Sequence, residues 1–128
     1  MKFVQNFRRF DGIFYLRDKT KREDVVLGYI STGNYIPAYS GNYVFIGHAN
    51  TPDEDKKEVV AASFFKGEMT RDEAVKFLTK ERIVYVFFGP QERELGNVFD
   101  LKQKYDFLNP VYNNNRVSIY KVNLIGGN

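Results

Sequence analysis

The sequence predicts an α/β domain, built as a three-layer Rossmann-like sandwich with a mainly parallel sheet. The first indication is Ile83–Phe88, an uncharged apolar run that is typical of a strand buried on both faces. The second is a pair of strong helix starts, at Thr51 and at Thr70. The third is the order of the predicted elements, in which strands alternate with helices and a C-terminal antiparallel hairpin follows. We expect that hairpin at one edge of the sheet.

Three apolar runs are predicted as strands before the hairpin. Ile83–Phe88 ends at Gly89-Pro90, where glycine allows a tight turn and proline suits the first position of a helix. A short charged helix over Gln91–Leu95 is therefore expected next. The two earlier runs are Val25–Ile30 and Tyr43–Gly47, and the turn-rich loop Ser31–Gly41 lies between them.

Both helices between the second and third strands begin with a capping box. Thr51–Glu54 places threonine at the N-cap, proline at the first helical position and glutamate three residues after the cap, and Thr70–Glu73 repeats the threonine and glutamate. After a weakly patterned segment, Tyr105–Tyr112 and Arg116–Val122 are expected to pair as the hairpin. Asn113–Asn115 suits its turn, because asparagine tolerates positive φ.

The first 24 residues differ from the rest of the chain. One interpretation is a helix that packs its apolar face on the domain, and the other is a basic amphipathic segment that lies on a membrane through Met1–Arg22. Asp11-Gly12 interrupts the helix pattern and weakens both. We divide the chain into a lead-in segment (1–24), a single α/β domain (25–122) and a tail (123–128). The aromatic residues at the spacing of one helix face are Phe3, Phe7, Phe10 and Phe14.

Composition excludes several classes of site. The chain has no cysteine, which rules out disulfides and thiolate ligands, and its single histidine makes a histidine-based metal centre unexpected. The dinucleotide fingerprint and the P-loop are absent, so no cofactor is expected. A net charge of +3 and a pI of about 9.0 permit contact with phosphate or anionic lipid without requiring it. No RNA-binding aromatic motif occurs, so nucleic acid is not an expected partner.

Polar residues follow the predicted strands where those strands end. His48 ends the second strand, Glu92 and Arg93 follow the third, and the loop after the first strand supplies further polar side chains. Because the carboxyl ends of parallel strands lie at one sheet edge, these residues are expected to converge on a ligand. The alternative is that they only hold the loops together, with Arg93 capping carbonyl groups. The full set of predicted binding residues is Asn34, Tyr35, Tyr39, His48, Glu92 and Arg93.

Three stretches, TGNYIPAYSG, YVFIGHANTPDEDKK and IVYVFFGPQEREL, together resemble one known family. That family is the soluble C-terminal domain of polytopic membrane glycosyltransferases of the GT-C type, related to protein mannosyltransferases. The resemblance covers residues 25–122, and none of its motifs is a catalytic signature. Its matching positions are Gly33, Ile36, Pro37, Ala38, Ser40, Gly41, Gly47, His48, Thr51, Tyr85, Val86, Gly89, Pro90, Glu92, Arg93, Val111, Tyr112 and Val117–Val122.

The resemblance implies a non-catalytic accessory domain that shapes access of an acceptor or a lipid-linked sugar to a membrane transferase. The family's catalytic acidic residues lie in its membrane part, so no catalytic residue is assigned here. The implied partner is the membrane-embedded transferase portion or, through Met1–Arg22, the membrane surface. The family is extracytoplasmic, whereas basic segments beside membrane helices favour the cytoplasmic side.

The alternative from another functional class is a stand-alone α/β protein that binds a small anionic ligand, such as a sugar phosphate or a nucleotide. Such a protein would be cytoplasmic. In the accessory-domain hypothesis above, Tyr35 and Tyr39 stack on sugar rings, and Asn34, His48, Glu92 and Arg93 hydrogen-bond hydroxyl groups or phosphate. An independent small enzyme is less favoured, because no nucleophile, metal cluster or cofactor loop is recognisable.

Overall fold

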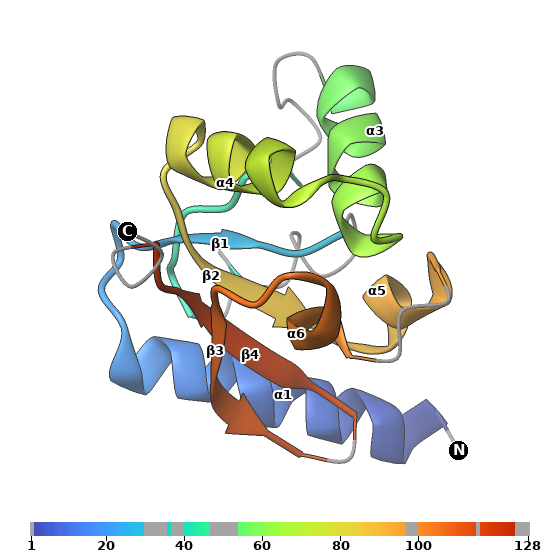
Figure 1. Cartoon of the computed structure of the whole chain (residues 1–128). Helices are drawn as coiled ribbons and strands as arrows, with labels where there is room; N and C mark the ends of the chain where they lie inside the picture. Colours follow the sequence, from blue (N-terminus) through green and yellow to red (C-terminus); the bar gives the residue numbers. More distant parts are fainter. Residues whose placement is uncertain are drawn as a thin grey trace.

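The structure is a computed structural model that describes residues 2–29, 36, 40–46, 54–96, 100–114 and 116–124, with backbone only for 2–10 and 54. Figure 1 shows the chain as a small sheet flanked by helices. In chain order the elements are α1 (Lys2–Lys19), β1 (Val25–Leu27), α3 (Glu54–Phe65), α4 (Arg71–Lys80), β2 (Ile83–Phe88), α5 (Pro90–Glu94), α6 (Leu101–Lys104), β3 (Leu108–Asn113) and β4 (Ser118–Val122).

The sheet is mixed, which corrects the expectation of a mainly parallel one. Its strand order is β1-β2-β4-β3; β1 and β2 are parallel, and the other two pairs are antiparallel. The hairpin is present and its strand β3 lies at one edge, as expected. The hairpin strand β4 takes the place beside β2 where a further parallel strand would have to lie. The chain is therefore α/β, but the described sheet does not have the predicted Rossmann-like pairing.

Four predicted strands differ in extent from those observed, since Val25–Ile30 is observed as Val25–Leu27 and Arg116–Val122 as Ser118–Val122. Within the described part of Tyr43–Gly47, Val44 forms only an isolated parallel bridge with Val26. The strand predicted from Tyr105 begins at Leu108 instead. Tyr105 is the C-cap of α6, and its backbone N–H donates to Leu101 O at 2.8 Å. The sequence analysis missed α6, since four residues are too few to show helical periodicity.

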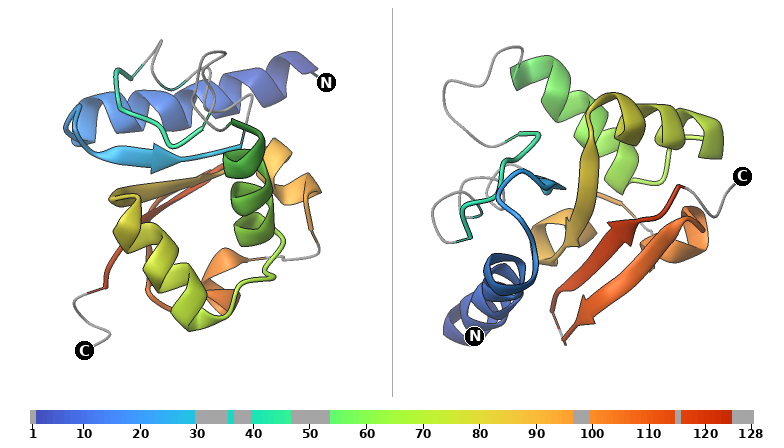
Figure 2. Two further views of the ribbon diagram at one scale, coloured as in Figure 1. Left: turned by 90° about the horizontal axis from the view of Figure 1, so that it is seen from above. Right: turned by 90° about the vertical axis from the view of Figure 1, so that its left-hand side faces the viewer.

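Helices cover both faces of the sheet. Figure 2 shows α1 on the side opposite α3 and α4. The face under α3 and α4 is filled by aromatic and aliphatic side chains that include Phe64, Phe65 and Leu78. On the α1 face, Ile13 and Leu16 pack with Phe87. β2 alternates between these clusters over Val86–Phe88 and is buried along nearly its whole length, so it is the central strand that its sequence predicted.

The start of α4 confirms a predicted capping box. The Glu73 N–H donates to Thr70 Oγ1 at 3.2 Å, and the Thr70 N–H donates to Glu73 Oε1 at 2.8 Å. These bonds satisfy N–H groups at the helix start that have no partner within the helix. The second predicted box, Thr51–Glu54, lies outside the described residues apart from the backbone of Glu54.

α1 is continuous through Asp11 and Gly12, which the sequence suggested would interrupt it. Gly12 permits close packing here: an added Cβ would lie 2.9 Å from Val117 Cγ1 and 3.2 Å from Phe87 Cε2. Ile13 and Leu16 are fully buried against the sheet, whereas Phe14 is 37% exposed. The second half of α1 therefore packs on the domain through Ile13 and Leu16 rather than through Phe14, and the side chains of Phe3, Phe7 and Phe10 lie outside the described part. The division of the chain at residue 24 stays a prediction.

A buried asparagine holds the end of α1. Asn42 is 2% exposed, and its Nδ2 donates to Thr20 Oγ1 at 3.0 Å, to Lys21 O at 2.8 Å and to Asp24 O at 3.2 Å. Its Oδ1 accepts a hydrogen bond from Ser40 Oγ at 2.7 Å. Because buried amide groups are costly without partners, this set of bonds fixes the turn between α1 and β1.

Because α1 packs closely on the sheet at Gly12, replacing this glycine with alanine should lower the stability of the protein rather than raise it. Glycine to alanine inside an open helix stabilises by about 0.5–1 kcal/mol, but Gly12→Ala should destabilise by about 1 kcal/mol because the new methyl group overlaps Val117. Urea unfolding measures the change. The Gly12→Ala/Val117→Ala double variant should lose less stability than the sum of the single changes. A stabilised Gly12→Ala protein would contradict this account.

Candidate functional site

Four of the six predicted binding residues, Asn34, Tyr35, Tyr39 and His48, lie outside the described residues. Their convergence therefore stays a prediction. The other two, Glu92 and Arg93, lie side by side on α5, directly after the carboxyl end of β2. Although adjacent in sequence, their side chains meet different surroundings, so each is described separately.

Glu92 is buried and joins two parts of the chain. Its Oε1 accepts a hydrogen bond from the Gly89 N–H at 2.9 Å, and its Oε2 accepts one from the Tyr29 N–H at 2.7 Å. Glu92 is 0% exposed. Tyr29 follows β1 and Gly89 follows β2, so these two bonds, here named the Glu92 bridge, tie together the carboxyl ends of the parallel pair. This supports the loop-holding alternative for Glu92.

Local geometry explains why the Glu92 bridge forms at this point. Gly89 precedes α5 with Pro90 at the helix start, and the third residue of that helix, Glu92, reaches back to the Gly89 N–H. A Cβ on Gly89 would lie 3.0 Å from Phe87 Cε1 and 3.4 Å from Glu92 Oε1. Glycine therefore leaves the space that the carboxylate occupies. Tyr29 adds a link to α3, because its hydroxyl donates to Glu58 Oε1 at 3.2 Å.

Arg93 lies beside a polar pocket rather than in the bridge. Its guanidinium carbon is 4.5 Å from the centre of the Phe88 ring, a cation–π contact. The pocket has a volume of about 430 Å³ and lies between α5, α6 and the β3–β4 hairpin. Figure 1 shows α5 and α6 near one end of that hairpin. Arg93 shares the lining with Asp100, Lys102, Gln103, Pro110, Asn113, Ser118 and Tyr120.

The side chains that line the Arg93 pocket carry an excess of positive charge. Asp100 Oδ1 accepts bonds from the Tyr120 hydroxyl at 2.8 Å and from the Lys102 N–H at 3.0 Å. The lining thus contains two cationic side chains and one carboxylate that already has two donors. Ser118 Oγ donates to Asn113 Oδ1 at 3.1 Å and adds a polar wall. Such a lining favours an anion that also carries hydroxyl groups.

The sequence analysis found only Arg93 among the pocket residues. Ser118 and Tyr120 alternate along β4, so they share a face, but the sequence does not tell which face meets α6. Asp100 and Lys102 belong to the segment in which no helix was expected. The signal that was available is Asp100 itself, an N-cap residue directly before the buried Leu101.

Burial raises the pKa of four tyrosines, Tyr29, Tyr85, Tyr105 and Tyr120, and the rise is largest for the last two. Burial, followed by the hydrogen bond to Asp100, raises the pKa of Tyr120 to about 12, although the nearby Arg93 charge lowers it somewhat. Burial also raises the pKa of Tyr105 to about 12. Its hydroxyl donates to Phe64 O at 2.8 Å, so it is a core hydrogen-bonding group. Both hydroxyls are protonated at neutral pH and serve as donors.

Within the part of the chain that the structure describes, no three histidine, cysteine or acidic side chains are grouped closely enough to hold a metal ion. The helices of that part include none that is both long and apolar enough to cross a bilayer. What the pocket offers chemically is hydrogen bonding and positive charge toward a bound ligand.

The fold resembles that of a solved structure. No protein-family model matches the sequence, and no curated protein matches it either. One similar structure is the C-terminal globular domain of the oligosaccharyltransferase AfAglB-S2 from Archaeoglobus fulgidus. The likeness has a TM-score of 0.60 at 14% sequence identity, and it covers 88% of this chain and 94% of the other. At that identity the likeness establishes a shared fold.

The Glu92 bridge predicts a large loss of stability when the carboxylate is altered. Glu92→Gln places an amide NH₂ against a backbone N–H, so one buried donor loses its acceptor, at a cost of about 1–3 kcal/mol. Glu94→Gln, an exposed neighbour on the same helix, is the matched control and should change little. Denaturant unfolding compares the two variants. Equal and small losses would show that the bridge contributes little.

The tyrosine pKa values predict a loss of stability in alkali. An unfolded tyrosine ionises near pH 10.0, whereas folded Tyr120 ionises near pH 12, so the unfolded chain loses its proton first and stability falls between these values. Tyr120→Phe should make that fall shallower, while Tyr105 continues to contribute. Tyr43→Phe, at a tyrosine that is 52% exposed, is the control. Equal slopes in both variants would contradict the assignment.

Proposed function

We propose that this chain is a non-catalytic globular domain of a membrane glycosyltransferase-like protein. The observation that carries the proposal is the likeness to the C-terminal globular domain of an oligosaccharyltransferase, which extends over 88% of this chain. A fold alone does not fix a function. The proposal gains independent support from the sequence motifs between residues 25 and 122 that resemble the accessory domain of such transferases.

The proposed role is to shape the access of an acceptor or a lipid-linked sugar to the membrane part. The Arg93 pocket supports this role, because its cations and hydroxyl groups suit a phosphorylated or polyhydroxylated molecule. The Asn34–Tyr39 loop and His48 belong to the same proposed surface. In this proposal the chemistry is supplied by acidic residues of the membrane part, and the domain lies on the extracytoplasmic side.

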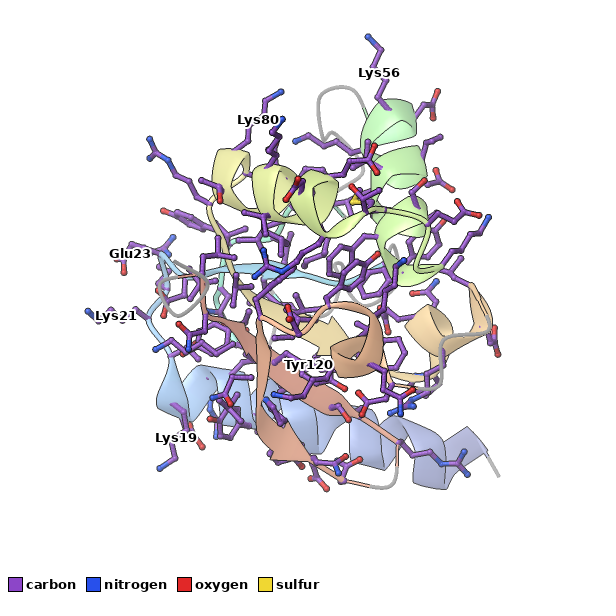
Figure 3. All side chains as sticks on the ribbon, in the orientation of Figure 1. Lys19, Lys21, Glu23, Lys56, Lys80 and Tyr120 are labelled. Atoms are coloured by element: carbon purple, nitrogen blue, oxygen red, sulfur yellow. The ribbon has the colours of Figure 1, made fainter. Side chains whose placement is uncertain are left out.

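The end of α1 is the proposed contact with the membrane or with the membrane-embedded portion. Arg17 and Lys19 lie in the last turn of the helix and Lys21 and Arg22 follow it, all of them exposed. Figure 3 shows Lys19 and Lys21 pointing away from the sheet on one side of the molecule, with Glu23 near them. Asp18 offsets part of this charge, since it pairs with Arg17 at 2.9 Å. The remaining positive charge favours an anionic surface.

The test is the size and location of the native polypeptide. An antibody raised against this domain is used to probe membrane and soluble fractions of the source cells. We expect a band far larger than 14.9 kDa in the membrane fraction. A band of about that mass in the soluble fraction would contradict the proposal.

A second candidate is a stand-alone protein that binds a small anionic ligand, and the Arg93 pocket favours it directly. Its volume of about 430 Å³ is within the roughly 300–1,000 Å³ usual for small-ligand sites. Thermal-shift measurements with sugar phosphates and nucleotides test this candidate. Arg93→Ala should abolish the ligand-induced shift, with only a small fall in the melting temperature of the free protein from the lost contact with the Phe88 ring. No shift with any ligand, or a large fall in the free melting temperature, would count against it.

A further inference from the structure

A second concave site, here named the lysine pocket, lies between α3 and α4. It has a volume of about 400 Å³ and shares no residue with the Arg93 pocket. Its position among α3 and α4 places it on the face of the sheet opposite α1. The lining residues are Phe45, Lys56, Lys57, Val60, Phe77, Lys80 and Glu81.

The floor of the lysine pocket is apolar. Phe45 and Phe77 meet edge to face, with ring centres 5.1 Å apart and planes at 81°. Val60 lies beside them on α3 and is half-buried. Val59, the residue before Val60 on that helix, is 66% exposed. This floor can accept a ring or an alkyl chain, whose burial is favourable in proportion to the apolar area removed from water.

The rim is cationic. Lys56 and Lys57 come from α3 and Lys80 from the end of α4, and Figure 3 shows Lys56 and Lys80 extending from the same side of the molecule. The Lys57 amino group lies 5.3 Å from the centre of the Phe45 ring, so it borders the floor directly. Among the described residues, no carboxylate forms an ion pair with these lysines. Glu81 is the acidic member of the lining, which leaves a net charge of about +2 there at neutral pH.

We propose that the lysine pocket binds a free amphipathic anion, in which an alkyl or aromatic body lies on the phenylalanine floor and a carboxylate or phosphate lies at the lysines. Three cations with one carboxylate among them leave a net repulsion, and an anionic head group relieves it. The concave shape favours a single molecule over a flat bilayer. The volume is in the usual range for small ligands. This inference does not depend on the proposed function.

The test uses decanoate, below its micelle concentration, as the probe. Heteronuclear NMR of the whole chain should show saturable shifts at Phe45, Val60 and Phe77. Decylammonium has the same chain length with the opposite charge and should bind far more weakly. Inorganic phosphate alone should bind weakly, because it lacks the apolar body. Equal binding of decanoate and decylammonium would overturn the proposal, as would binding to anionic vesicles without binding of decanoate.

Charge variants locate the head group. Lys57→Gln/Lys80→Gln should weaken decanoate binding about tenfold, which is about 1.4 kcal/mol shared between two partly exposed ion pairs. Two substitutions outside the pocket, Lys76→Gln on α4 and Lys104→Gln on α6, together remove the same charge and form the control. Equal affinities in the two double variants would overturn the proposal. Val60→Phe fills the floor and should abolish binding independently of charge.

Discussion

A single buried carboxylate sets the geometry of the sheet edge from which the candidate site is built. The Glu92 bridge gives this carboxylate two backbone donors, from segments that are far apart in the sequence. A buried carboxylate is tolerated only where hydrogen bonds replace its lost water, so the two segments and α5 have to keep one arrangement. Because Arg93 follows Glu92 directly, the bridge also decides where the guanidinium lies relative to Phe88 and the Arg93 pocket.

The rest of the domain is arranged around β2 in two layers of packing. On one face α3 and α4 contribute aromatic side chains, and the lysine pocket opens between these helices. On the other face α1 approaches closely at Gly12, and Asn42 fixes its end. The lysine pocket and the Arg93 pocket therefore lie on different parts of the surface, the first between α3 and α4 and the second between α5, α6 and the hairpin. The Arg93 pocket is polar and has its donors already ordered, whereas the lysine pocket combines an apolar floor with lysines at its rim.

Sequence reasoning succeeded where local chemistry decides the structure. Ile83–Phe88 and the Thr70 capping box carry their signals within a few residues, and both are observed. Sequence reasoning failed where the local structure depends on a residue that is distant in the sequence. Gly12 was interpreted as a helix interruption because Val117, which it contacts, lies more than 100 residues away. For Glu92 the sequence left ligand binding and loop holding as alternatives, because its partner Tyr29 lies 63 residues away. The position of β4 beside β2 likewise depends on which strands pair, and the hydrophobic pattern of a single strand does not specify its partner.

The most direct test of the account is amide hydrogen exchange at Tyr29 and Gly89, followed by NMR. Both N–H groups donate to Glu92 at the carboxyl edge of the parallel pair, and the measurement needs no ligand. We predict that both amides exchange slowly in the native protein and that protection at both falls together in Glu92→Gln, while the central β2 amides stay protected. Rapid exchange at both positions in the native protein would contradict the claim that Glu92 holds this edge of the sheet.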